Sequence, residues 1–419
     1  MEDVPAAAGD ATSPALRYLA GAERAAAALP GPPGRVRAQL VSRAGIIGVG
    51  SAARALAMAC ADAGLPAVLI GADPVALDRA LAGIRAAYES ELSRTQITAD
   101  QRAGRLTLIH GSTALADVND VDLIVEAGPQ DLPRRLEIFR TLRALRCTDA
   151  VLASIAPTPN LHEIASLCGE PERLIGLNAF GAAHRSPVLE IVRSEQTSTE
   201  ALAVALGFSA RIRKIGVVLG PSQGSWGSRA MLDVLLSEAG ELLHAGLSRE
   251  HIDRVLESFG FAAGPFSLAE RHAEVSAEHA EDGARGPASA ARRSHGDAHA
   301  SEGRMRHIPD AQLLACCLYP LINAGARMLA EGAAWRAGDI DVVWTRGYGF
   351  PTGRGGPMYH ADQIGLATVY EGLRRLGSGR GPNWDPAPLI EELVHTGGRL
   401  TGWTHRPGPD SRGRPQASY

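Results

Sequence analysis

The sequence predicts an α/β domain with a mostly parallel sheet, followed by an all-α domain made of two similar helical units. Two observations predict this fold class. Up to about residue 219, short apolar segments alternate with helical stretches, the pattern of a parallel sheet covered by helices on both faces. From residue 220 onward only helical patterns follow, and one of them occurs twice.

Length and composition limit the function. The 419 residues are 45% hydrophobic and 21% charged, which is typical of a soluble globular protein with two or three domains. The net charge of −4 argues against nucleic acid as a partner, and the apolar runs are too short to predict a membrane span. Five scattered cysteines without a C-x-x-C pair, an acidic N-terminus and the C-terminus "PQASY", which is no peroxisomal signal, favour a cytoplasmic location.

The predicted elements follow the chain in order. Residues 1–40 hold an alanine-rich linker helix, "PALRYLAGAERAAAALPG", and residues 41–219 form the α/β domain. Helices are predicted after the glycine turn "GVGSAA" and at 74–94 and 132–146. The strands are predicted from the short apolar segments "AGII", "AVLIG", "RLTLIHG", "VDLIVEAG", "AVLASIAPT", "RLIGLNAF", "VLEIVR" and "KIGVVLG".

The helical units are predicted at 220–275, where the unit is shortened, and at 306–405. Both run helix, Ala-Gly, helix, Ile-Asp-x-Val, Gly-Phe and Gly-Pro; the matched pairs are Ile252-Asp253 with Ile340-Asp341 and Gly264-Pro265 with Gly356-Pro357. We expect the two copies to pack on each other, burying "LLSEAGELL" against "LINAGARML". Such packing predicts a monomer, or a homodimer formed through the helical domain.

Two segments are predicted to lie outside the packed domains. Residues 276–305 are rich in Ala, Gly, Ser and charge, which predicts a mobile linker. Several histidines lie in or beside this segment, but their spacing matches no tetrahedral metal site, so we expect no metal. Residues 406–419 are predicted to be a disordered tail.

The glycine turn indicates a Rossmann-type dinucleotide site. Gly48, Gly50 and Ala53 follow an apolar strand and open a helix, which is the context that the G-x-G-x-x-G/A pattern requires. The first glycine makes the tight turn, the second lets the backbone approach a pyrophosphate, and the third position packs the helix on the strand. The pattern predicts NAD as the cofactor, with its pyrophosphate at the helix N-terminus.

The adenosine side of this site lacks its usual carboxylate. An acidic residue that binds the ribose diol is expected at the end of the second strand, where Gly71 stands. Asp73 follows two residues later and either reaches the ribose or caps the helix that begins at Pro74. We therefore expect weak or lost NAD binding.

The stretch "LNAFGAAHRSPVLEIV" resembles the "HFFNP…LVEV" signature of 3-hydroxyacyl-CoA dehydrogenases. The resemblance runs from the first helix to about Trp403 and is closest to the dehydrogenase half of the multifunctional fatty-acid β-oxidation enzymes. "DIDVVWTRGYGFPTGRGGPMYHAD" is similar to a long signature of their last helical domain. The resemblance implies NAD-dependent oxidation of 3-hydroxyacyl-CoA to 3-ketoacyl-CoA, with an acyl-CoA or acyl-carrier thioester as partner.

The resemblance also implies where catalytic residues would lie. The positions of the family's serine, histidine, glutamate and asparagine hold Pro157, Asn178, Glu190 and Ser228 here, so only the glutamate is kept. A further family glutamate, near the nicotinamide side, aligns with Gln130.

The site chemistry predicts impaired or lost dehydrogenase activity. Asn178 has no nitrogen that accepts a proton near neutral pH, and losing a positioned base costs on the order of 10²–10⁴ in rate. Pro157 removes both a hydroxyl and a backbone donor.

Glu190 is interpreted either as a leftover partner, pairing with an arginine such as Arg229, or as a residue with a new catalytic role. Three functions remain open: a working dehydrogenase, a repurposed non-redox enzyme that acts on an acyl thioester through Glu190, and a non-catalytic scaffold subunit.

Overall fold

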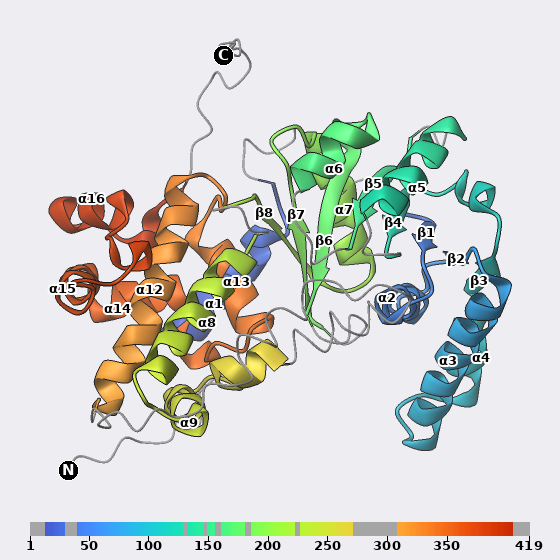
Figure 1. Ribbon diagram of the computed structural model, residues 1–419. Coiled ribbons are helices and arrows are strands. Elements are labelled where there is room, and N and C mark those ends of the chain that lie inside the picture. The colour runs from blue at the N-terminus through green and yellow to red at the C-terminus, as the bar shows by residue number, and fades with distance from the viewer. Residues whose placement is uncertain are drawn as a thin grey trace, which may run out of the picture.

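The computed structural model describes residues 13–29, 40–128, 132–145, 149–155, 161–180, 186–222, 227–270 and 308–404. Figure 1 shows a sheet region with helices on both faces, and beside it a region of helices only. This arrangement confirms the predicted fold class. The predicted linker, the C-terminal tail, Pro157 and Gln130 lie outside the described residues.

The sheet has eight strands in the order β3-β2-β1-β4-β5-β6-β7-β8. All neighbouring strands pair in parallel except β6 and β7, which are antiparallel. The strands are β1 (Ala44–Ile47), β2 (Ala67–Ile70), β3 (Ile109–Ser112), β4 (Leu123–Glu126), β5 (Val151–Ser154), β6 (Leu174–Ala179), β7 (Val188–Val192) and β8 (Ile215–Leu219).

Helices cover both faces of the sheet because successive strand residues point to opposite sides. Ile46 packs into a core with residues of α2 and α7, whereas its neighbour Ile47 packs into a second core with residues of α5 and α6. The helices of this region are α2 (Ser51–Asp62), α3 (Pro74–Ser93), α4 (Ala99–Leu106), α5 (Leu132–Ala144), α6 (Leu161–Cys168) and α7 (Thr199–Arg211).

The structure corrects the prediction around the edge strand β3. The predicted strand "RLTLIHG" was wrong at its start, because Arg105 and Leu106 belong to α4. Since β3 is the edge strand, His110 and Gly111 are exposed rather than buried. The sequence contains a signal for α4: Thr98 and Gln101 form a capping box at its N-terminus. Helix α6 was not predicted either.

The helical region confirms the predicted packing of the two units. Helix α8 packs along α12, so the segment "LLSEAGELL" lies against "LINAGARML". Helix α12 is 21 residues long and contains an 18-residue window with a mean hydropathy of 1.5, yet 72% of that window is buried, as in the core helix of a folded domain. The helices are α8 (Arg229–His244), α9 (Arg249–Phe259), α12 (Asp310–Ala330), α13 (Ala337–Arg346), α14 (Pro357–Ile364), α15 (Leu366–Leu376) and α16 (Pro388–Thr396).

Equivalent aspartates make equivalent caps in the two units. Asp253 Oδ1 accepts a hydrogen bond from the Phe266 N–H at 3.1 Å, directly after the first Gly-Pro pair. Asp341 Oδ1 accepts from the Met358 N–H at 2.7 Å, directly after the second. Asp341 Oδ2 also accepts from the Tyr18 hydroxyl of α1 (Pro14–Ala26) at 2.8 Å, so the linker helix is bonded to the second unit.

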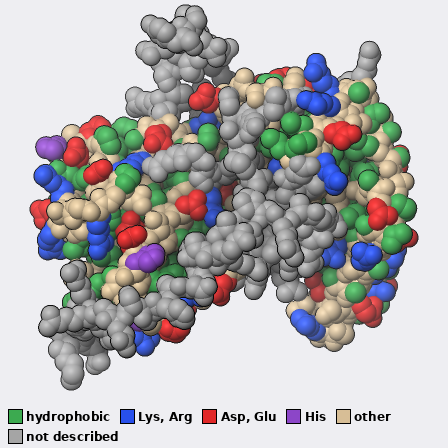
Figure 2. Space-filling view, in the orientation of Figure 1, with side chains coloured by type: hydrophobic (Ala, Val, Ile, Leu, Met, Phe, Trp, Pro, Cys, Tyr) green, Lys and Arg blue, Asp and Glu red, His purple; other side chains and the backbone are tan. Residues whose placement is uncertain are grey.

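The sheet and the helical region share hydrogen bonds and a hydrophobic core. The Gly220 N–H donates to Ala333 O at 2.6 Å, and Leu219 forms an isolated β-bridge with Ala334 between α12 and α13. Val217 of β8 packs in the same buried cluster as Leu321 of α12. On the face shown in Figure 2, side chains of both charges are interspersed among the coloured residues.

Candidate functional site

The glycine turn has the geometry of a pyrophosphate cradle. Gly48 has a φ of +129°, and a Cβ there would lie 2.5 Å from Ala127 O, so only glycine fits. Gly50 precedes α2 without a side-chain cap, and the space around its would-be Cβ is open. Ala53 is fully buried beneath the turn. The free N–H groups at the start of α2 therefore fit a pyrophosphate.

The ribose side of the same site fits NAD less well. Gly71 follows β2 and has no carboxylate to offer, and a Cβ there would lie 2.6 Å from Val49 Cγ1 and 3.0 Å from Leu77 Cβ. Asp73 Oδ1 accepts from the Val75 N–H at 3.0 Å, so Asp73 caps α3. Of the two interpretations of Asp73, the structure shows the cap. Among the described residues, the place of the diol-binding carboxylate is filled by Val49 and Leu77.

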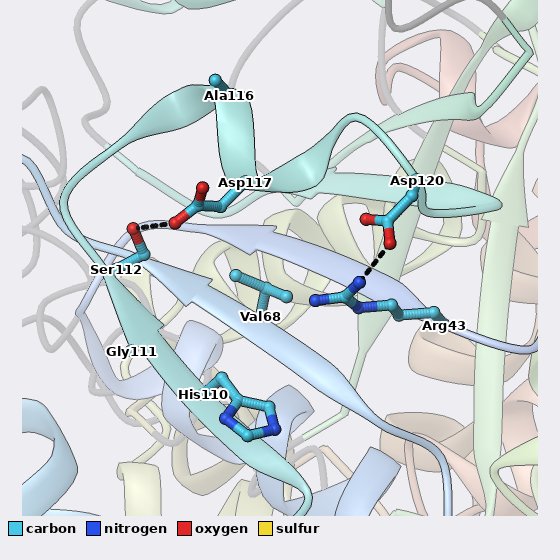
Figure 3. Close-up of a pocket in the computed structure, with 8 residues that line it drawn as sticks. All are labelled: Arg43, Val68, His110, Gly111, Ser112, Ala116, Asp117 and Asp120. Atoms are coloured by element: carbon cyan, nitrogen blue, oxygen red, sulfur yellow. Dashed lines mark hydrogen bonds and ion pairs between the residues drawn. The ribbon is translucent and has the colours of Figure 1, made fainter.

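A shallow hollow lies beside the edge strand β3 (Figure 3). Its charged side chains are already engaged: Arg43 pairs with Asp120, and the Ser112 hydroxyl donates to Asp117 at 2.5 Å. Arg43 precedes β1, at the opposite end of that strand from the glycine turn. The hollow thus runs from Arg43 to Ser112 at the carboxyl end of β3, where Ser112 O accepts from the Gly71 N–H at 3.0 Å.

Glu190 lies at the centre of a buried hydrogen-bond cluster. The antiparallel register of β6 and β7 places Asn178 directly opposite Glu190, and Asn178 Nδ2 donates to Glu190 Oε2 at 2.9 Å. Ser228 precedes α8; its N–H donates to Glu190 Oε1 at 2.7 Å, and its hydroxyl donates to Oε2 at 2.9 Å. The structure thus brings together three of the four predicted catalytic positions.

The loop before α8 approaches the Glu190 carboxylate closely. Gly227 has a φ of +45°, and a Cβ there would lie 1.8 Å from Glu190 Oε1. Any side chain at 227 would displace the carboxylate. The predicted alternative pairing of Glu190 with Arg229 is wrong, because Arg229 Nε donates to Asp233 at 2.7 Å, one helical turn along α8.

Tyr348 completes the cluster from the second helical unit. It lies just after α13 and is buried, and its hydroxyl is 3.2 Å from Ser228 Oγ. Its ring packs edge-to-face on Phe180, with centroids 4.9 Å apart. Sequence reasoning missed Tyr348, and its only signal was the position within the repeated Gly-Phe segment.

A second buried glutamate lies at the carboxyl end of β4. Glu126 is 0% exposed, and Arg135 Nε of α5 lies 3.0 Å from its Oε2. The Ser154 hydroxyl donates to Oε2 at 2.7 Å, and the Gly128 N–H donates to Oε1 at 2.8 Å. Sequence reasoning missed this cluster as well.

The electrostatics of Glu190 follow from its surroundings. Burial raises the pKa of the Glu190 carboxyl, against the lowering effect of the Ser228 and Asn178 hydrogen bonds. All three donors are neutral, and the Asn178 amide nitrogen cannot accept a proton near neutral pH. Among the described residues, the cluster therefore holds the Glu190 carboxyl in place with neutral donors only. Within the described ranges, no three His, Cys, Asp or Glu side chains are placed to hold a metal ion.

Sequence comparison identifies both parts of the chain. Residues 43–222 match the 3-hydroxyacyl-CoA dehydrogenase NAD binding domain, and residues 314–404 match the 3-hydroxyacyl-CoA dehydrogenase C-terminal domain. A peroxisomal bifunctional enzyme from Cavia porcellus is 30% identical over 91% of this chain and 61% of its own length. A peroxisomal fatty acid beta-oxidation multifunctional protein from Arabidopsis thaliana is 26% identical over 85% of this chain and 56% of its own. The chain therefore spans less than two thirds of these relatives.

Solved structures show the same fold. A 3-hydroxybutyryl-CoA dehydrogenase from Escherichia coli aligns with a TM-score of 0.69 at 18% identity, covering 85% of this chain and 99% of its own. The dehydrogenase part of multifunctional enzyme 1 from C. elegans aligns with a TM-score of 0.59 at 20% identity, covering 91% and 97%. Because the two matched domains together account for more than half of the residues, the chain belongs to the 3-hydroxyacyl-CoA dehydrogenase family.

Proposed function

We propose that this chain keeps the cofactor and acyl-thioester fold of its family but carries out NAD-dependent oxidation of 3-hydroxyacyl-CoA poorly or not at all. The observation that carries the proposal is the Asn178–Glu190 hydrogen bond of 2.9 Å. Where oxidation needs a base beside the buried glutamate, this chain has an amide that donates to it.

The proton balance of the reaction supports this proposal. Bound NAD would supply the hydride acceptor, and a protein base must take the hydroxyl proton of the substrate. Asn178 cannot take it, and Glu190 is 0% exposed with both oxygens accepting hydrogen bonds. Ser228 donates its hydroxyl to Glu190 rather than toward a ligand. Losing the base alone lowers the rate on the order of 10²–10⁴.

The same geometry argues against the repurposed-enzyme alternative. A new role for Glu190 as the lone base would require an oxygen that reaches a ligand, and both oxygens are engaged.

We also propose that NAD binds weakly. The pyrophosphate cradle at Gly48 and Gly50 supports some affinity for NAD. The ribose diol, however, finds no carboxylate acceptor at Gly71. A lost hydrogen bond of this kind costs about 1–3 kcal/mol, or roughly ten- to a hundredfold in affinity.

The proposal is tested by following NADH oxidation with acetoacetyl-CoA on the purified chain. We expect a turnover at least about a hundredfold below the ~10 s⁻¹ that is common for enzymes. Calorimetric titrations with NAD and with acetoacetyl-CoA measure the two binding steps separately. A rate near ~10 s⁻¹ would refute the proposal.

Restoring the base separates the contributions of the site residues. Asn178→His alone should leave activity low, because Pro157 and Ser228 still lack the donors that the family resemblance implies, and residues that act as a unit are strongly non-additive. The triple change Pro157→Ser, Asn178→His and Ser228→Asn should raise the rate of NADH oxidation above that of the unmodified chain and above that of the single variant Asn178→His. Asn178→Gln, which keeps an amide, is the matched control and should gain nothing.

A further inference from the structure

Tyr348 connects the second helical unit to the Glu190 cluster. Its side chain is 1% exposed, and its ring lies between Phe180, in an edge-to-face contact at 4.9 Å, and Trp344, tilted at 4.7 Å. A ring held on two sides leaves its hydroxyl little freedom. The 3.2 Å contact between this hydroxyl and Ser228 Oγ is therefore a fixed part of the site.

The direction of this hydrogen bond follows from a count of protons. Ser228 has one hydroxyl proton and donates it to Glu190 Oε2 at 2.9 Å. When Glu190 is ionised, Tyr348 must therefore donate to Ser228. Burial, and next the nearby Glu190 charge, raise the pKa of Tyr348, so the phenol keeps the proton that it donates. The result is a directed chain from Tyr348 through Ser228 to Glu190.

Two other charged groups of the described residues act on Tyr348. They are Arg229 and Asp233, which pair with each other at 2.7 Å on α8. The remaining donor to Glu190, Asn178, is neutral.

We infer that Tyr348 is a positioning residue that holds the Ser228 hydroxyl on Glu190 and thereby keeps Ser228 from donating to a bound acyl thioester. The second helical unit thus contributes a side chain to a site whose other residues lie on β6, on β7 and directly before α8. The inference concerns the site of the proposed function but depends only on the hydrogen-bond chain, so the two can fail separately.

The test is a carbon-13 NMR titration of glutamate carboxyl groups in the full chain, with the Glu190 signal assigned by its loss in Glu190→Gln. Tyr348→Phe keeps the ring and removes the hydroxyl. Because Ser228 then loses the donor that orients and polarises it, the pKa of Glu190 should rise by about half a unit to one unit. An unchanged Glu190 pKa overturns the inference.

Two further variants define the path. In a Ser228→Ala background, Tyr348→Phe should cause no additional shift, and a shift that persists there overturns the role of Ser228. Tyr88→Phe is the matched control, because it removes a buried hydroxyl that bonds Asp62 at 3.0 Å and should leave Glu190 unchanged.

If Tyr348→Phe does not fold, a second change at Tyr348 that shifts the Glu190 pKa in the opposite direction tests the inference. Incorporation of 3-fluorotyrosine makes the Tyr348 hydroxyl a stronger donor at almost unchanged size, and should lower the Glu190 pKa; no change overturns the inference. The NADH oxidation rate, measured on the same samples, tests the proposed function alone. A high rate would refute that proposal without affecting the titration.

Discussion

Two buried glutamates of the same sheet are held in different ways. Glu126 and Glu190 are both 0% exposed, and burial raises the pKa of each carboxyl. Glu126 has a cation, with Arg135 Nε at 3.0 Å, in addition to neutral donors. Glu190 has neutral donors only. The comparison teaches that Glu190, with Asn178 opposite it, is a carboxylate that neutral hydrogen-bond donors keep in place, whereas Glu126 has a cation beside it.

The largest expected effect comes from neutralising Glu126. Glu126→Gln removes the carboxylate that lies 3.0 Å from Nε of the Arg135 guanidinium, whose side chain is 2% exposed. Breaking a buried ion pair on one side costs about 3–5 kcal/mol in the free energy of unfolding. Urea denaturation at pH 7 measures the loss, with Glu137→Gln on the exposed side of α5 as the control. A loss below about 1 kcal/mol would show that the pair is not worth more than a surface pair.

Removing the cation should make Glu126 resemble Glu190. Arg135→Met leaves the Glu126 carboxyl buried with neutral donors, so its pKa should rise further. A raised folded-state pKa gives a contribution to stability that is present below the unfolded pKa and lost as pH rises through the folded pKa. The variant should therefore lose about 2–4 kcal/mol at pH 8 and clearly less at pH 5. Equal losses at the two pH values would contradict the comparison.

Adding a cation should make Glu190 resemble Glu126. In Asn178→His, the carboxylate opposite should raise the imidazole pKa, so the stabilising contribution is present below pH ~6.5 and is lost as pH rises through the new pKa. We expect unfolding free energies at pH 6 and pH 9 to differ by about 1 kcal/mol more than in the unmodified chain. Asn178→Gln should show no such difference. If the unfolding free energy of Asn178→His does not change more with pH than that of the unmodified chain, the hydrogen bonds from Ser228 already stabilise the carboxylate without a cation.

The smallest effect should come from Glu190→Gln. No cation is left behind. With the new NH2 group in place of Oε2, Ser228 Oγ can accept from it while it turns its proton toward Tyr348, and Asn178 can turn its amide so that Oδ1 accepts as well. At neutral pH the free energy of unfolding should change by less than about 1 kcal/mol. Because the raised pKa makes the ionised Glu190 unfavourable in the fold, the variant should gain relative stability as pH rises from 5 to 8. A loss comparable to that of Glu126→Gln would erase the distinction between the two sites.

The fold was largely predictable because local patterns carry it. Apolar segments predicted the strands, and the duplicated Gly-Pro segments predicted the two units whose caps Asp253 and Asp341 form. Helix α4 was missed because its apolar pattern is weak and none of its residues is buried, although Thr98 and Gln101 signal its start. The ion pair between Arg229 and Asp233 could also have been predicted, because residues four positions apart lie on the same face of a helix.

The site was only partly predictable because it is assembled by tertiary contacts. The family resemblance located Asn178, Glu190 and Ser228, but not the atoms to which each donates. Tyr348 lies 120 residues from its partner Ser228. The obstruction by Val49 above Gly71 depends on how α2 and α3 meet the strands, which no spacing in the sequence specifies.

The bridge between β8 and the segment after α12 bears on how the protein unfolds. Leu219 pairs with Ala334, and strand residues such as Val217 lie in one buried cluster with Leu321 of α12. Unfolding of the helical region would expose β8 to solvent, and unfolding of the sheet would expose the helix residues that pack against β8. Heat should therefore melt the two regions in a single cooperative transition, with no plateau in which one survives alone. The first matched domain ends at residue 222, and we expect this boundary in the sequence not to separate two units that unfold independently.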